Sequence, residues 1–208
     1  MTQPLLMETF LDRLATASPT PGGGSVAALA GATGAGLVSM VCRLTLPKTE
    51  DGDLIERLSL ACERADELRL RLTSLIERDA ASYDAVITAY RLPKNTDDEK
   101  QRRRGAIQDA LKVAATVPAE TAATALELLS LAHEIVPDAT RNAISDIAVA
   151  VHMAYASFSS AWVNVRINLG SIRDDSFIER MNAQARTDRE HAASLCQTTI
   201  DRVDAALQ

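Results

Sequence analysis

Aromatic residues are scarce in this sequence and make up only 3% of its 208 residues. β-Strands favour aromatic and β-branched side chains, so this scarcity argues against a sheet. Hydrophobic residues still make up 47% of the chain, and the core must therefore be built from Ala, Leu, Val and Ile. Small aliphatic side chains let helices approach one another closely. The composition therefore predicts an all-α fold.

Cysteine and histidine are also scarce, with three of each. They are widely spaced, without a CxxC, HxxxH or HExxH pattern: Cys42, Cys62, Cys196, His133, His152 and His191. This spacing argues against a disulfide framework and against a zinc site, so we expect no metal. Scattered thiols are typical of a reducing compartment, and the N-terminus lacks the features of a secretory signal. We therefore expect a cytoplasmic protein.

The charge pattern excludes another class of protein. The formal net charge is -6, and the acidic and basic residues are interleaved. Nucleic-acid binding needs a clustered basic surface, so we expect no nucleic acid. Residues 25–42 carry no charge, and a run of this length is near the lower limit for a membrane span. Because the run is rich in Ala and Gly, a central, fully buried helix is the better interpretation, and we expect no membrane.

No internal repeat, low-complexity tract or linker divides the chain, which predicts a single domain over residues 1–208. Apolar periodicity, prolines and capping residues predict long helices in an up-and-down-type bundle. Ser25 is placed to cap the second helix, and Thr96–Glu99 has the pattern of a capping box. The expected helices cover about residues 5–17, 25–44 and 53–90, then one from the capping box, one that Pro118 opens, one over about 141–169 and one from about 175 onward.

The first candidate site is the loop before the second helix, which contains Gly22, Gly23, Gly24 and Ser25. Backbone N–H groups at a helix start attract anions, and glycines let a ligand approach the backbone. The alternative is a tight connection in which the glycines only permit the turn. The residues alone leave both interpretations open.

The second candidate is Asn142 with Asp146, which are four residues apart and would share a helix face. An apolar stretch follows Asp146, so burial could raise its pKa and make it a general base. The alternative is a first-turn acid that interacts with the helix dipole. Asn164 and Asn168 continue the stripe, but Asp146 and Asn164 would lie about 27 Å apart along one helix. They cannot serve one small-molecule site unless a second helix or subunit rearranges the geometry.

The third candidate is Asp79 with Tyr83 and Asp84, late in a long helix, followed by Lys94 just past its end. A carboxylate and an ammonium there could act as a base and as an anchor for an anion. The alternative is a solvated helix end. Physical reasoning from the residues stops at a helical bundle whose polar groups could converge.

Five segments resemble, in order and at similar spacing, the motifs of the cyclodeaminase/cyclohydrolase family of folate enzymes. The resemblance spans about residues 7–170 and is greatest to the stand-alone bacterial methenyltetrahydrofolate cyclohydrolases. The segments are Thr20-Pro-Gly-Gly-Gly-Ser-Val-Ala-Ala, Met40-Val-Cys-Arg-Leu-Thr, Tyr90-Arg-Leu-Pro-Lys-Asn-Thr-Asp-Asp-Glu, Asn142-Ala-Ile-Ser-Asp and Asn164-Val-Arg-Ile-Asn.

The resemblance implies an all-helical homodimer with no metal or nucleotide cofactor and with a folate substrate in a cleft. It implies hydrolysis of 5,10-methenyltetrahydrofolate to 10-formyltetrahydrofolate, and the reverse ring closure. Asp146 is then expected as the base, oriented by Asn142, with Asp79 as the second choice. Lys94 or Lys48 would protonate the departing nitrogen or hold the glutamate tail of the folate. The other matching positions, expected to bind substrate, are Gly22, Gly23, Gly24 and Ser25.

The sequence departs from the family pattern in two places. Pro47 precedes Lys48 where the family usually has Gly-Lys, and Ala139-Thr140 replaces the Gly-Asn expected before Asn142. Two rival functions remain: a formiminotetrahydrofolate cyclodeaminase that releases ammonia, and a non-catalytic, folate-binding helical dimer. A Lys48 that lies in the cleft beside Asp79 and Asp146 would favour an enzyme. A splayed loop with both carboxylates in salt bridges would favour the binding protein.

Overall fold

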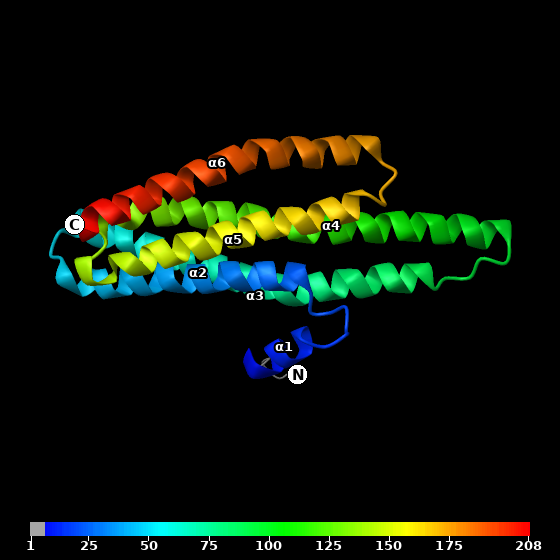
Figure 1. The fold of residues 1–208 in the computed structure, drawn as a ribbon, viewed down its shortest axis with the longest axis horizontal. Helices are drawn as coiled ribbons and strands as arrows, with labels where there is room; N and C mark the ends of the chain where they lie inside the picture. Colours follow the sequence, from blue (N-terminus) through cyan, green and yellow to red (C-terminus); the bar gives the residue numbers. More distant parts are fainter. Residues whose placement is uncertain (1–6) are drawn as a thin grey trace.

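Five long helices form an antiparallel bundle in the computed structural model, which describes residues 7–208 (Figure 1). A short helix, α1, precedes the bundle, and the part of the chain described contains no strand. The prediction of an all-α, up-and-down bundle is therefore confirmed. The helices are α1 (Met7–Leu14), α2 (Gly23–Thr45), α3 (Gly52–Tyr90), α4 (Asp97–Ile135), α5 (Ile144–Leu169) and α6 (Asp175–Leu207).

The first expected helix is only partly testable, because residues 5 and 6 lie outside the described residues. Within them, α1 ends at Leu14, earlier than expected, and buries Phe10. The expected helix over residues 53–90 is confirmed as α3, which Asp51 caps through its side chain. The capping box of α4 is also confirmed, with Thr96 and Glu99 bonding to each other's backbone.

Helix α2 packs against α3, α4 and α5, as expected for a central helix. Small residues make this packing possible: a Cβ atom on Gly34 would lie 2.9 Å from the carbonyl oxygen of Ala150 on α5. The segment Gly23–Lys48 is long and apolar enough to cross a membrane, and 61% of its most apolar window is buried in the bundle. The expected full burial is wrong, because Val26 and Met40 are 37% and 36% exposed on the face turned away from the core.

Ser25 does not cap α2, which corrects the assignment made from the sequence. The helix begins at Gly23, and its N-cap is Gly22, which offers no side-chain hydrogen bond. Ser25 lies in the first turn, where its hydroxyl is directed to α3 and shares its one proton between the carbonyl oxygen of Ile76, at 3.1 Å, and the carboxylate of Asp79, at 3.0 Å. A contact with a residue far away in the sequence thus replaces a local cap.

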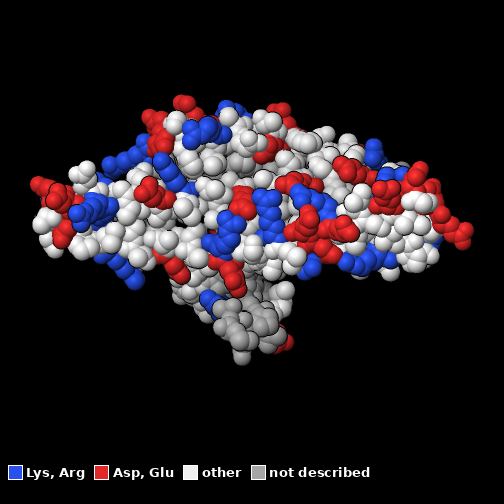
Figure 2. Space-filling view, turned by 180° about the vertical axis from the view of Figure 1, so that it is seen from behind, with Lys and Arg blue, Asp and Glu red and all other residues white. Residues whose placement is uncertain are grey.

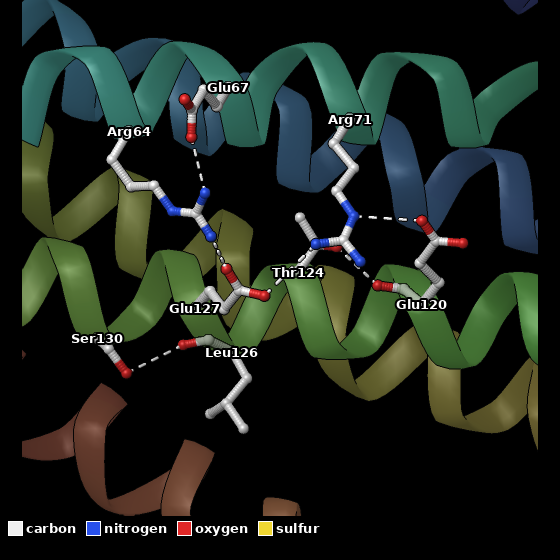
Figure 3. Close-up of polar contacts among 8 residues, drawn as sticks. All are labelled: Arg64, Glu67, Arg71, Glu120, Thr124, Leu126, Glu127 and Ser130. Atoms are coloured by element: carbon white, nitrogen blue, oxygen red, sulfur yellow. Dashed lines mark hydrogen bonds and ion pairs between the residues drawn. The ribbon is translucent and has the colours of Figure 1, made fainter.

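Ion pairs at seven-residue spacing join α3 to α4. Figure 3 shows Arg71 between Glu120, at 3.2 Å, and Glu127, at 3.5 Å, with Arg64 also bound to Glu127. The pairs continue along the seam, and their members are Arg57, Arg64, Arg71 and Arg78 on α3 with Glu120 and Glu127 on α4 and Asp138 just beyond it.

This ladder accounts for part of the interleaved charge of the sequence, and Figure 2 shows acidic and basic residues side by side on the face seen from behind. A seven-residue repeat keeps side chains on one seam of an antiparallel helix pair. Exposed ion pairs contribute only about 0–1 kcal/mol each, so their main effect here is on register.

Helix α4 runs without interruption through Pro118, so the separate helix expected to begin there is wrong. A proline inside a helix has no N–H for the carbonyl four residues earlier, which here belongs to Ala114. Asn168 on α5 supplies the missing donor, because its Nδ2 donates to the Ala114 oxygen at 2.7 Å. A side chain from the neighbouring helix therefore allows α4 to continue.

Replacing Asn168 with Leu should lower the free energy of unfolding by about 1–3 kcal/mol, because the Ala114 carbonyl is then left without a donor. Adding Pro118→Ala should recover most of the loss, since the new backbone N–H can bond that carbonyl. Urea unfolding of both variants measures the effect. An Asn168→Leu protein as stable as the unmodified protein would contradict the assignment.

Candidate functional site

The side chain of Asp79 is held in a fixed position between α3 and the start of α2. Its Oδ2 accepts a hydrogen bond from the Ser25 hydroxyl at 3.0 Å, and Ser25 is completely buried. The same hydroxyl contacts the Ile76 carbonyl, which fixes it against α3. A carboxylate at a helix N-terminus also interacts favourably with the helix dipole. Asp79 is therefore held by the hydroxyl of Ser25 and by the dipole of the helix that begins beside it.

Gly24 must be glycine for Asp79 to lie where it does. A Cβ atom at Gly24 would be 2.0 Å from Asp79 Oδ1, which is closer than any real contact. No described glycine has a positive φ, so the turn does not require the glycines of this loop for their backbone angles. The interpretation based on close approach is supported, although the group that approaches Gly24 in this structure is a carboxylate of the protein itself.

Asn164 of α5 completes this group of residues, which we call the glycine-loop cluster: Gly22–Ser25, Asp79 and Asn164. A Cβ atom at Gly23 would lie 3.4 Å from the amide of Asn164. Asn164 Nδ2 donates to the carbonyl of Ser160 at 2.9 Å, which fixes the amide. Helices α2, α3 and α5 thus each contribute a polar group to one place.

Burial raises the pKa of Asp79 above its ordinary value, and the hydrogen bonds from Ser25 partly offset this effect. Among the described residues, no lysine or arginine forms an ion pair with Asp79. A carboxyl with a raised pKa is a better proton acceptor near neutral pH. A half-buried carboxylate without a counter-ion also attracts a cationic ligand.

Lys48 lies at the other end of α2, in the second group, which we call the α2-end cluster: Thr45, Lys48, Thr140, Asn142 and Asp146. Lys48 Nζ donates to Thr140 Oγ1 at 3.1 Å, and the Thr140 N–H donates to Thr45 Oγ1 at 3.1 Å. The two places where the sequence departs from the family pattern therefore contact each other. Sequence reasoning did not select Thr45 or Thr140 as site residues, although Thr45 ends the motif that begins at Met40 and Thr140 is one of the departures from the family pattern.

Asn142 and Asp146 do not share the face of one α-helix, as the spacing predicted. Asn142 lies in a 3-10 segment, Arg141–Ala143, and α5 begins only at Ile144. Asn142 is exposed and Asp146 is half-buried. Neither side chain forms a hydrogen bond with any other residue in the range 7–208.

The two clusters do not meet within one chain. Helix α2 separates them by about 33 Å, at 1.5 Å per residue. Lys48 therefore lies at the same end as Asp146 and far from Asp79, while neither carboxylate is in a salt bridge with a described residue. Lys94 is exposed beyond the end of α3, and about 16 Å of helix separates Asp79 from Tyr90. Lys48 is thus at the same end of the bundle as Asp146 but not beside Asp79, so the arrangement that would favour an enzyme is found only in part.

Buried thiols and the spacing of His, Cys, Asp and Glu side chains complete the description of the polar groups. Cys42 and Cys62 are buried and free, and burial is the main reason that the pKa of Cys42 rises to about 12. A thiol held in its protonated form is a poor nucleophile. Within residues 7–208, no group of three or more His, Cys, Asp and Glu side chains could hold a metal ion.

Gly24→Ala and Gly23→Ala form a matched pair, because each adds one methyl group at the start of α2. Gly24→Ala should lower the free energy of unfolding by about 1–3 kcal/mol, since its Cβ would collide with Asp79. Gly23→Ala only meets Asn164 at ordinary contact distance and should be neutral or stabilising by up to about 1 kcal/mol. Urea unfolding compares them, and equal stabilities would contradict the close contact.

Asp79→Asn removes a half-buried charge but keeps an oxygen that can accept from Ser25. The raised pKa means that folded Asp79 holds its proton to a higher pH than unfolded Asp79. The free energy of unfolding therefore falls as the pH rises from the ordinary value, about 3.9, through the raised one. At about pH 7, Asp79→Asn should be at least as stable as the unmodified protein, and near about pH 4 most of that advantage should disappear.

Urea unfolding of the two proteins at both pH values measures this difference, in which the titration of all other groups cancels. Lower stability of Asp79→Asn at neutral pH would show that the charge of Asp79 stabilises the fold, which would contradict a raised pKa.

Comparison with known proteins places this arrangement in a family. A family model described as formiminotransferase-cyclodeaminase matches residues 6–187. The methenyltetrahydrofolate cyclohydrolase of Methylorubrum extorquens is 46% identical over 173 residues, which cover 83% of this chain and 83% of that protein. The formimidoyltransferase-cyclodeaminase of Rattus norvegicus is 34% identical over 84% of this chain, which spans only 32% of that longer protein.

A solved structure agrees with this assignment. The crystal structure of a formiminotetrahydrofolate cyclodeaminase from Thermotoga maritima superposes with a TM-score of 0.87 at 28% identity, over 98% of both chains. Sequence motifs, helix arrangement and family model thus agree. The chain belongs to the formiminotransferase-cyclodeaminase family.

Proposed function

We propose that this protein is a methenyltetrahydrofolate cyclohydrolase, which converts 5,10-methenyltetrahydrofolate and water to 10-formyltetrahydrofolate and catalyses the reverse ring closure. The observation that carries the proposal is the 46% identity, over 83% of both chains, to the Methylorubrum extorquens protein of that name. The glycine-loop cluster adds a half-buried carboxylate without a cationic partner among the described residues. The reaction needs only water and proton transfers, so it requires no cofactor.

In the proposed mechanism, Asp79 faces the cationic carbon between N5 and N10 of the substrate. The carboxylate stabilises this cation and accepts a proton as water adds and the C–O bond forms. The tetrahedral intermediate then breaks its bond to N5, which takes a proton, and the remaining O–H proton leaves as the formyl C=O forms. A net proton is released because a cation gives a neutral product.

Asp79 is better supported than Asp146 as the base. The carboxyl of Asp79 has a pKa that burial raises, and the Ser25 hydroxyl holds it by a hydrogen bond. Asp146 is half-buried, and no described residue holds its carboxylate. We therefore assign Asp146 and Lys48 to binding or to proton donation at N5, and Lys94 to the glutamate tail.

We further propose a homodimer in which the two clusters of different chains form one cleft. Apolar side chains are exposed along α2 and α5 between the clusters: Val26, Met40, Leu44, Val149, Val163 and Ile167. A two-fold axis through the middle of this face would reverse the direction of α2 in the partner. The glycine-loop cluster of one chain would then lie opposite the α2-end cluster of the other, which removes the separation of about 33 Å.

The first test follows the loss of methenyltetrahydrofolate absorbance with and without the purified protein. Clear acceleration over spontaneous hydrolysis is expected. The specific alternative is a cyclodeaminase, favoured by the Thermotoga maritima structure of that name, and formiminotetrahydrofolate is its substrate. A higher kcat/KM for formiminotetrahydrofolate, with ammonia released, would replace the proposal. If the protein binds folate but catalyses neither reaction, the remaining function is that of a non-catalytic, folate-binding dimer.

Subunit mixing tests the shared cleft. Asp79→Asn and Asp146→Asn should each have little activity alone, but mixed dimers contain one cleft with both carboxylates intact. After subunit exchange, the mixture should recover about a quarter of the unmodified activity, because half of the dimers are mixed and each has one good cleft. Mixing Asp79→Asn with Asp79→Ala is the control and should recover none. Equal results from the two mixtures would contradict the shared cleft.

A further inference from the structure

A separate cavity of about 200 Å³ lies between α5 and α6. Its lining residues are Trp162, Val165, Arg166, Leu169, Asn182, Ala185, Arg186 and Arg189. At 100° per residue, Arg166 lies about 200° around α5 from Asn164 of the glycine-loop cluster. The cavity therefore opens on the opposite side of α5 from that cluster.

The polar side chains that line this cavity are almost all hydrogen-bond donors. Arginine has five N–H donors and no acceptor, and the tryptophan indole only donates. Asn182 provides the single side-chain acceptor, and no Asp or Glu is part of the lining. A complementary ligand must therefore be negatively charged and rich in acceptor oxygens.

None of the cavity's donors is satisfied by the rest of the described chain. The guanidinium groups of Arg166, Arg186 and Arg189 form no hydrogen bond or ion pair with any residue in the range 7–208, whereas those of the α3–α4 ladder are all paired. Trp162 is only 4% exposed, and its Nε1 has no partner among the described residues.

A shortage of acidic residues does not explain why the three arginines of the cavity have no acidic partner. The protein has 28 acidic residues against 22 basic ones, and they are interleaved along the sequence. Asp188, which precedes Arg189, is buried and accepts instead from Gln184 at 2.7 Å. The three arginines are exposed at the mouth of the cavity, where solvent screens their like charges in part, and a bound anion would remove the repulsion that remains.

We propose that this cavity, the α5–α6 anion site, binds a small doubly charged oxyanion, either a phosphate group or a dicarboxylate. Planar guanidinium groups bind both classes with paired N–H···O hydrogen bonds. The site is distinct from the proposed folate cleft, and it does not depend on the cyclohydrolase assignment.

Trp162 is the only tryptophan in the chain, so its fluorescence reports directly on this cavity. The experiment titrates the protein with inorganic phosphate and, separately, with succinate, while sodium chloride holds the ionic strength constant. One of the two should give a saturable change, which identifies the class of ligand. Arg186→Gln should weaken the apparent affinity about tenfold or more.

Arg180→Gln is the matched control, because it makes the same change on the same helix outside the cavity. Arg180 lies over the ring of Phe177 instead. Its variant should bind phosphate or succinate like the unmodified protein. No saturable change with either anion, or equal weakening in the Arg186 and Arg180 variants, would overturn the proposal. Competition between the anion and tetrahydrofolate would overturn the claim that the two sites are distinct.

Discussion

The contact between Asp79 and the first turn of α2 constrains much of this structure. It requires glycine at position 24, a buried hydroxyl at Ser25 and close approach of α3 to the start of α2. Burial makes the charged form of Asp79 costly, since it raises the pKa. Proteins retain such groups where function needs them, because stability alone would favour a neutral side chain. A carboxylate held in this way suits a reaction that begins from a cation.

The packing of α2 explains why the site is divided. Its small residues bring α2 close to α5, and the two helices run antiparallel over their whole length. The polar residues at the start of α2 therefore meet the end of α5, and those at the end of α2 meet the start of α5. Each chain therefore has one of the two polar clusters at each end, and the proposed homodimer would bring the two kinds of cluster together. The α5–α6 cavity lies outside this arrangement.

Local signals were sufficient to predict much of the fold. The helix over residues 53–90 and the capping box at Thr96 depend on neighbouring residues, and both were predicted. Two of the errors come from contacts between distant residues: Asn168 supports the carbonyl opposite Pro118, and Ile76 binds the hydroxyl of Ser25. The same limit applies to the site. Asp79 and the glycines were selected as separate candidates, but their contact depends on how α3 packs on α2.

The fold holds Asp79 as a half-buried carboxyl with a raised pKa. The most direct test is an NMR titration of side-chain carboxyl carbons in protein labelled with ¹³C-aspartate, with Asp79→Asn used to assign the resonance. We predict that the resonance absent from the variant titrates above the ordinary aspartate value of about 3.9. A midpoint at or below that value would show instead that the fold favours the charged form, so that Asp79 would be a stabilising acid at the start of α2.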